Sequence, residues 1–128
     1  MGKLNFGIVG YGWVAGAHIP SFESIEDCEV TSICSRREIP QEEFVATHGK
    51  SFSLYNNFDE MLKDAALDVI SICTPHPFHV EQVEKACAAG KHVVIEKPMA
   101  LDWDGCKRIR SAVREAGVKA LVCFEGRV

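Results

Sequence analysis

The chain opens with residues that could hold a phosphate group. An apolar run ends at Gly10, and the spacing Gly10-x-Gly12-x-x-Ala15 leads into a segment that can be helical. Gly10 would allow a tight turn, Gly12 would let the backbone approach a pyrophosphate without a Cβ in the way, and Ala15 would keep the helix close to the sheet. The helix would then direct its free N–H groups at the phosphates. This pattern predicts a dinucleotide-binding loop, whose other contact residues would be Tyr11, Trp13 and Val14.

A second polar segment bears on which dinucleotide would bind. A site for NAD usually has an acidic residue about 20 positions beyond the fingerprint, where it takes the ribose hydroxyls. Here Ser35 stands 20 positions after Ala15 and is followed by Arg36 and Arg37. A hydroxyl and two guanidinium groups would hydrogen-bond a 2′-phosphate, and Arg36 could stack on the adenine. We therefore favour NADP over NAD, the alternative being two solvated arginines after a strand in an enzyme that uses NAD.

Alternating strands and helices must position these residues. Apolar runs predict strands at 4–9, 30–34, 51–55 (an edge strand), 69–73, 92–95 and 120–124, and helical patterns predict helices at 13–25, 40–48, 58–65, from 79 to just before Gly90, and after Asp102 up to Gly117. The central strands are continuously apolar, as parallel strands covered on both faces must be. We expect an α/β fold with a doubly wound parallel sheet, the Rossmann dinucleotide-binding fold, in the strand order 3-2-1-4-5-6.

This topology would gather the polar segments at one place. Gly10, Ser35, Thr74 and Lys97 each follow an apolar run. The carboxyl ends of parallel strands share one edge of the sheet, and ligands bind there where the strand order reverses. Four independent polar features at one edge strengthen the interpretation of the glycine loop.

Several local features carry narrower expectations. In the helix 13–25, Val14, His18, Phe22 and Ile25 share one face, and Pro20 should kink or shorten the helix. We expect His18 to be a packed, hydrogen-bonded histidine rather than a catalytic one. Asp59 is a plausible N-cap of the helix 58–65. The helix capped by Asp102 is expected to bury Trp103, Cys106, Ile109, Val113 and Ala116.

Length and composition restrict the remaining function classes. With 128 residues, 47% apolar and 25% charged, the chain is one globular domain. A net charge of −4 without a long basic run speaks against nucleic acid as a partner. No stretch is apolar enough to span a membrane, and the amino-terminal residues do not resemble a signal peptide, so a cytoplasmic protein is expected. The six cysteines form no CxxC pair and are interpreted as small buried hydrophobes, with no metal site.

Three segments resemble a known family. Residues 7–15 with His18, the run Thr74-Pro75-His76-Pro77-Phe78-His79, and residues 90–98 with Glu96-Lys97-Pro98 look like the amino-terminal domain of the glucose-fructose oxidoreductase/inositol dehydrogenase (Gfo/Idh/MocA) family. The likeness covers essentially all 128 residues. It implies an NAD(P)-dependent oxidoreductase that transfers a hydride between nicotinamide and a sugar, a polyol or a related substrate with a hydroxyl or carbonyl group.

The resemblance also implies roles for single residues. Lys97 would be the catalytic residue that meets the reacting hydroxyl or carbonyl, and its peptide bond to Pro98 is often cis in the family. A partly desolvated lysine can polarise a carbonyl or assist proton transfer, whereas the alternative is a surface lysine after a strand. His79 would lie near the nicotinamide end or merely start its helix. The remaining cofactor contacts would be Thr74, Pro75, His76 and Glu96. Family members commonly have Asn in place of His76, and the segment 123–128 also departs from the family pattern, with Cys123 for Gly and Glu125 for Asn, while Arg127 is kept.

The same resemblance implies a second domain. In the family that domain supplies substrate contacts, a catalytic histidine and the oligomer interface, so the whole protein would be a homo-oligomer acting on a small molecule. Residues 1–128 would form the NAD(P)-binding domain, without a counterpart of the second. We expect this chain by itself to bind NADP(H) weakly without turnover. The alternative is a non-catalytic dinucleotide sensor or regulatory module on the same fold.

Overall fold

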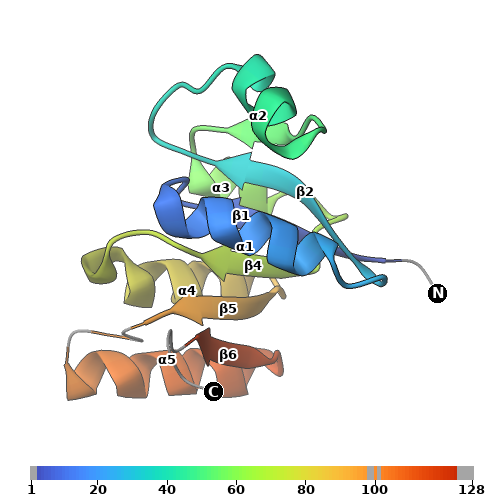
Figure 1. Cartoon of the computed structure of the whole chain (residues 1–128). Coiled ribbons are helices and arrows are strands. Elements are labelled where there is room, and N and C mark those ends of the chain that lie inside the picture. Colours follow the sequence, from blue (N-terminus) through green and yellow to red (C-terminus); the bar gives the residue numbers. More distant parts are fainter. Residues whose placement is uncertain (1–2, 98–99, 101, 124–128) are drawn as a thin grey trace.

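The computed structural model describes residues 3–97, 100 and 102–123, and its centre is a six-stranded parallel sheet in the order β3-β2-β1-β4-β5-β6 (Figure 1). The expected fold class and strand order are confirmed. The strands are β1 Leu4–Val9, β2 Cys28–Cys34, β3 Ser53–Tyr55, β4 Val69–Ile72, β5 His92–Glu96 and β6 Ala120–Cys123. β2 begins two residues before the expected range, and β5 extends one residue further.

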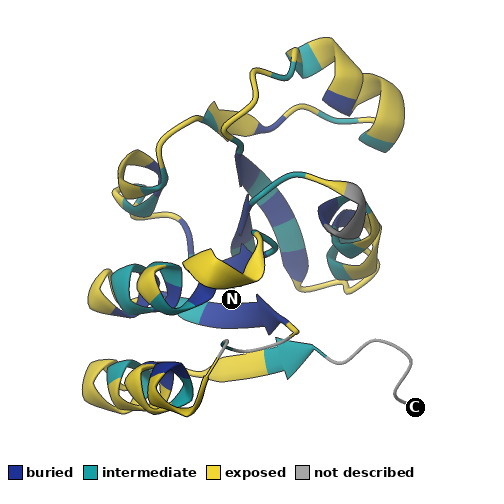
Figure 2. Ribbon diagram, turned by 90° about the vertical axis from the view of Figure 1, so that its left-hand side faces the viewer, coloured by how far each residue is buried: buried dark blue, intermediate teal, exposed yellow. Residues whose placement is uncertain are grey.

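Helices cover both faces of the sheet (Figure 2). They are α1 Trp13–Glu23, α2 Gln41–His48, α3 Phe58–Leu62, α4 His79–Ala88 and α5 Trp103–Ala116, with a 3₁₀ turn, η1 His76–Phe78, before α4. Side chains of α1 and α2, such as Ile19 and Phe44, pack with Ile8 and Ile33 of the sheet. Those of α3, α4 and α5 pack in a second cluster on the other face.

The strand register brings the carboxyl ends of four strands to the same level. Val9 of β1 pairs with Cys34 of β2 and with Ile72 of β4, and Ile72 in turn pairs with Ile95 of β5. The residues that follow these strands therefore lie side by side at one edge of the sheet. This edge is the one that the sequence pattern predicts for a ligand.

Helix α1 differs in detail from its expected form. Pro20 lies inside the helix without ending it, and the helix continues to Glu23, where Ser24 N donates to the Pro20 carbonyl. The prediction that Ile25 belongs to this helix and shares a face with His18 and Phe22 is wrong, because Ile25 follows the end of the helix and is 52% exposed. Ala15 and Ile19 form the fully buried part of the helix instead.

The other helices require two corrections. The N-cap of α3 is Asn57, whose side chain accepts from Glu60 N at 3.1 Å, so Asp59 is not the cap but a residue of the first turn. Asp102 caps α5 as expected. Trp103, however, is 69% exposed and Ala116 is also exposed, contrary to the prediction that both are buried. The buried side of α5 holds Gly105 and Ile109, and a residue two positions before Gly105 points to the opposite side of a helix.

Candidate cofactor-binding site

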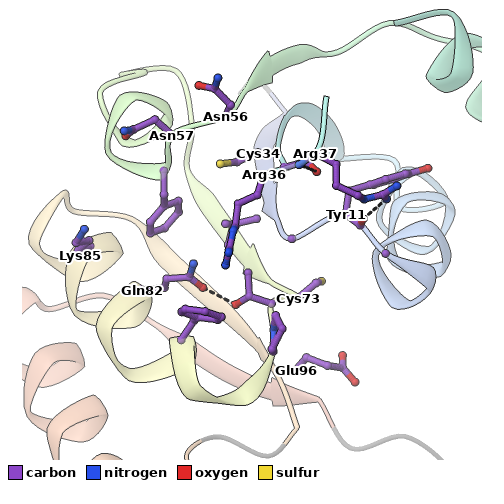
Figure 3. A pocket seen from close by; sticks show the side chains of 18 of the residues that line it. Tyr11, Cys34, Arg36, Arg37, Asn56, Asn57, Cys73, Gln82, Lys85 and Glu96 are labelled. Carbon is purple, nitrogen blue, oxygen red and sulfur yellow. Dashed lines mark hydrogen bonds between the residues drawn. The ribbon is translucent and has the colours of Figure 1, made fainter. Parts of the chain in front are cut away.

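A cavity of about 870 Å³ lies at the carboxyl ends of β1, β2, β4 and β5 (Figure 3). Of the residues predicted to contact a cofactor, the cavity is lined by Gly10, Tyr11, Gly12, Ser35, Arg36, Arg37, Thr74, Pro75, His76, Glu96 and Lys97. The side chains of Trp13 and Val14 lie outside the described part of the chain, as do Pro98 and the segment 124–128. The structure thus brings together polar segments that are far apart in sequence.

The turn after β1 is built around Gly10. Gly10 has φ +88°, which favours glycine, and its N–H donates to the Cys34 carbonyl at 2.9 Å. A Cβ at this position would lie 2.8 Å from the backbone nitrogen of Thr74 and 2.9 Å from its Cα. The close approach to Thr74 therefore requires a residue without a side chain, and it holds the loop after β1 against the loop after β4.

The amino end of α1 is open to an anion. Gly12 is the N-cap, with extended backbone, and no side chain caps this end. The first turn of the helix contains no acidic residue, and nothing lies within 4 Å of the position that a Gly12 Cβ would take. The first N–H groups of a helix have no partner inside it and carry the positive end of its dipole. The open space at Gly12, the free N–H groups of the helix and the positive end of its dipole all favour the binding of a phosphate.

Two arginines extend from the loop after β2. The Arg37 side chain donates from Nη2 to the Tyr11 carbonyl at 3.0 Å, and the Arg37 N–H donates to Ser35 Oγ at 3.3 Å. The Cζ atom of Arg36 lies 5.5 Å from the ring centroid of Phe78, which belongs to the turn η1 across the cavity. Among the described residues neither guanidinium pairs with a carboxylate. The positive charge of both is therefore available to a ligand.

The opposite wall contains residues that sequence reasoning missed. Asn56 and Asn57 follow β3, and the rule that ligands meet the carboxyl ends of strands would have found them. Gln82 and Lys85 lie on α4, where Gln82 contacts the Thr74 hydroxyl and Lys85 Nζ lies 3.2 Å from Asp59 Oδ1. Their spacing from Phe78, four and seven positions, is that of one helix face and was the available signal.

The end of β5 supplies a buried carboxylate and an exposed lysine. Glu96 is only 8% exposed, and Lys97 is exposed and lines the cavity. The Nε2 atom of His18, from α1, lies 3.0 Å from Glu96 Oε2, and its Nδ1 lies 3.4 Å from Ser71 Oγ. The His18 ring also packs edge-on to Phe22. His18 is therefore a packed histidine with polar contacts, as expected from the sequence.

His79 lies at the start of α4, behind the residues that line the cavity. Its side chain is fully buried and does not line the cavity. Its Nε2 lies 2.8 Å from the Thr74 carbonyl oxygen, and the residue is the first of α4. The histidine thus fixes the loop after β4 from behind, because the start of α4 turns its ring toward the protein interior. His76, which precedes it in η1, is exposed and lines the cavity.

The cysteines and the tyrosine at this edge stay uncharged at neutral pH. Burial raises the pKa of the Cys73 thiol to about 11, and burial also raises the pKa of Cys34. Burial and the nearby Glu43 carboxylate raise the pKa of Tyr11, whose hydroxyl lies 2.9 Å from His48 Nε2. These groups form a neutral wall and offer no activated nucleophile.

Comparison with known proteins identifies a related family. A family model described as an oxidoreductase family with an NAD-binding Rossmann fold (Gfo/Idh/MocA) matches residues 4–124. A scyllo-inositol 2-dehydrogenase (NADP(+)) of Bacillus subtilis is 30% identical over 115 residues, which are 90% of this chain and 35% of that protein. The chain spans about a third of the length of the curated relatives it matches.

Solved structures show the same similarity. The WlbA dehydrogenase of Bordetella pertussis, in complex with NADH and UDP-GlcNAcA, is 32% identical with a TM-score of 0.85, over 94% of this chain and 37% of that one. The biliverdin reductase of Synechocystis, in complex with biliverdin and NADP+, is 28% identical with a TM-score of 0.83, over 93% and 37%. Neighbours of this fold thus include complexes with either nicotinamide dinucleotide.

No helix in the described part of the chain is long and apolar enough to cross a membrane.

Proposed function

The chain belongs to the Gfo/Idh/MocA family of oxidoreductases with an NAD-binding Rossmann fold, and on that premise we propose that its cavity binds NADP(H) for hydride transfer to or from a sugar, polyol or related substrate. The single observation that carries this proposal is the cavity itself. It joins an uncapped helix end at Gly12, two guanidinium groups that pair with no carboxylate of the described residues, and an exposed lysine along one sheet edge. In NADP these groups would face, respectively, the pyrophosphate, the 2′-phosphate of the adenosine ribose and the nicotinamide end.

The preference for NADP rests on charge. Arg36 and Arg37 are not neutralised by carboxylates of the described chain, and the third cation at this side of the cavity, Lys85, is already paired with Asp59 and Glu81. The 2′-phosphate of NADP is negatively charged and can form ion pairs with the two arginines, whereas the 2′-hydroxyl of NAD is neutral and cannot. Arg36, which lies against Phe78, could in addition stack on the adenine.

Lys97 is proposed as the residue that meets the reacting oxygen of the substrate. It directly follows the last strand residue, Glu96, and its exposed side chain lines the cavity. In the reduction direction an ammonium group there could polarise the carbonyl and protonate the alkoxide that forms when hydride is added. In the oxidation direction the neutral amine could take the proton of the hydroxyl. The thiols of Cys34 and Cys73 stay protonated at neutral pH and would not compete for this role.

For this chain by itself we propose cofactor binding without turnover. Catalysis by proximity requires that the substrate be held against the nicotinamide from both sides, and the described residues form one wall of such a cleft. The second candidate function, a dinucleotide sensor, is disfavoured by the exposed Lys97 at the edge of the cavity, which a sensor does not need. A sensor would bind NADP(H) and retain all of its properties when Lys97 is changed.

The experiment that tests the proposal has two parts. The chain is titrated with NADPH while nicotinamide fluorescence is followed, and saturable binding with one site is expected. The longer protein, if the reading frame continues, is then assayed with NADP+ and NAD+ against a panel of sugars and polyols. Absence of binding by both NADPH and NADH would overturn the proposal.

A further inference from the structure

Three potential metal ligands from different elements lie close together next to the part of the cavity that is lined by Lys97. They are His18 of α1, Glu96 of β5 and Cys123 of β6, all at most half exposed. Their ligand atoms, the imidazole nitrogen, a carboxylate oxygen and the thiol sulfur, all lie within 4.8 Å of one another. A nitrogen, an oxygen and a sulfur ligand together are the donor set of Zn²⁺.

The Glu96 carboxylate has an ion-pair neighbour but no hydrogen bond at its buried oxygen. Glu96 is 8% exposed, and its buried Oε2 atom accepts no hydrogen bond among the described residues. Its nearest basic neighbour is His18 Nε2 at 3.0 Å, an ion-pair distance. A cation bound between the two side chains would give the carboxylate oxygen a direct partner. A buried oxygen left in this state is costly unless something else binds it.

The histidine is oriented from its other side. Nδ1 of His18 lies 3.4 Å from the Ser71 hydroxyl and 3.7 Å from Cys73 Sγ. When Nδ1 carries the proton and donates it to Ser71, the lone pair of Nε2 is left for a metal. Metal-binding histidines are usually held by such a contact at the second nitrogen. Ser71 is fully buried, so this contact is fixed by the core.

We propose that His18 Nε2, Glu96 Oε2 and Cys123 Sγ bind one Zn²⁺ ion and so join α1, β5 and β6. Zinc ligands lie about 2.0–2.3 Å from the ion, so ligand atoms around a tetrahedral ion are separated by roughly 3.2–3.7 Å. The pair His18–Glu96 is close to that separation, and Cys123 needs a shift of about 1 Å at most. Binding exchanges the Cys123 thiol proton for the metal and leaves a fourth position open.

This site goes beyond the proposed cofactor function. Glu96 also lines the cavity, so an ion held here would lie next to Lys97 and hold in place the strand end that carries it. The absence of a CxxC pair predicts no metal site from the sequence, and the three ligands are far apart in the chain. Only the packing of α1 on the sheet and the pairing of β5 with β6 bring them together.

The test is a titration of the reduced chain with Co²⁺ and with Zn²⁺. Co²⁺ should bind with one equivalent per chain and give the visible bands of tetrahedral cobalt, together with a thiolate-to-cobalt charge-transfer band. Added Zn²⁺ should displace the bound Co²⁺ and so remove both the visible bands and the charge-transfer band. In excess of about a hundredfold over its dissociation constant, Zn²⁺ should raise the thermal midpoint by roughly 10 °C.

Variants assign the ligands. Cys123→Ser should remove the charge-transfer band, and His18→Gln should weaken Co²⁺ affinity by at least about a hundredfold, while Ser71→Ala should weaken it by about tenfold or more. Cys106→Ser, a half-buried thiol on α5 outside the cluster, is the matched control and should keep the full spectrum. Far-ultraviolet circular dichroism checks that each variant is folded.

Two results would overturn the metal site. One is the absence of saturable Co²⁺ binding by the wild-type chain, and the other is a charge-transfer band that survives in Cys123→Ser or is lost in Cys106→Ser. If Cys123→Ser does not fold, the His18→Gln variant decides, because unchanged affinity there excludes the proposed ligand set. NADPH titration of the same samples distinguishes this failure from failure of the cofactor site.

Discussion

The backbone of Thr74 lies so close to Gly10 that a methyl group on Gly10 would come within 2.8 Å of the Thr74 nitrogen. This contact joins the loop after β1 to the loop after β4, and both loops line the cavity. The positive φ of Gly10, +88°, adds a second reason for glycine. The phosphate loop is therefore shaped by a backbone contact as well as by its own turn.

The first prediction follows from this contact. Gly10→Ala should lower the free energy of unfolding by clearly more than the roughly 1–2 kcal/mol that a left-handed alanine costs, because the Thr74 backbone must also move. It should also weaken NADPH binding by at least about tenfold, a loss of roughly 1.4 kcal/mol. Urea unfolding and NADPH titration measure the two effects.

Gly49 offers the matched control for Gly10. It has φ +74° at the end of α2, but nothing lies within 4 Å of the position of its Cβ. Gly49→Ala should therefore lower the free energy of unfolding only by the amount that the positive φ of an alanine costs, and it should leave NADPH affinity unchanged. Equal losses of stability in Gly10→Ala and Gly49→Ala would show that the contact with Thr74 is unimportant.

The second prediction concerns Arg36. Arg36→Ala should weaken NADPH binding by roughly tenfold to a hundredfold, since hydrogen bonds to charged groups are worth about 1.5–3 kcal/mol. NADH affinity should change far less, because its ribose lacks the phosphate. Arg110→Ala, an exposed arginine of α5, serves as the control for the general loss of positive charge. A similar loss of affinity for NADPH and NADH in Arg36→Ala would assign Arg36 to adenine stacking alone.

The third prediction is a dependence of stability on alkaline pH. The folded chain holds the pKa of Cys73 at about 11, compared with 9.0 for an ordinary thiol, because the thiol is buried. Between these values the unfolded chain releases the Cys73 proton and the folded chain keeps it, so stability is intact below about pH 9 and falls as the pH rises toward 11. The contribution of Cys73 is about 2–3 kcal/mol.

The measurement is urea unfolding from pH 8 to pH 11 for the wild-type chain and for Cys73→Ala. The variant should lose less stability over this range, although it starts from a lower value because a buried side chain has been cut back. Cys106→Ala controls for the removal of a thiol elsewhere. Parallel stability curves for wild type and Cys73→Ala would mean that Cys73 ionises equally in both states.

The fourth prediction tests the role proposed for Lys97. In the longer protein, Lys97→Ala should abolish turnover and leave NADPH affinity within about twofold, because the lysine meets the substrate oxygen and not the phosphates. Lys63→Ala, an exposed lysine of the α3 carboxyl end, should leave both unchanged. Turnover retained by Lys97→Ala would favour the sensor.

The alternation of apolar runs and helical patterns was sufficient to predict the sheet order. Since parallel strands end at one edge, it was also sufficient to predict that Gly10, Ser35, Thr74 and Lys97 converge. The pattern could not predict which side of a helix turns to the core, nor which of two suitable residues caps a helix. Asn57 and Asp59 are both good N-caps, and only the backbone geometry selects Asn57. Trp103 fits an apolar helical pattern, yet α5 turns Gly105 and Ile109 to the core.

Contacts between side chains of elements that are far apart in the sequence could not be predicted from the patterns either. His79 stands at the start of a helix in the sequence, but whether its ring points into the cavity or behind the wall depends on how η1 joins α4. The approach of His18 to Glu96 depends on how α1 lies across β4 and β5. Such relationships follow from packing and register, which local patterns of residues in a sequence do not reveal.

The ratio of two dissociation constants tests most directly whether the cavity is an NADP site: one for NADPH and one for NADH, measured for this chain under identical buffer and salt. We expect NADPH to bind at least about tenfold more tightly than NADH, and we expect a higher ionic strength to reduce this ratio because the additional binding of NADPH is electrostatic. NADH binding as tightly as NADPH, or more tightly, would contradict it.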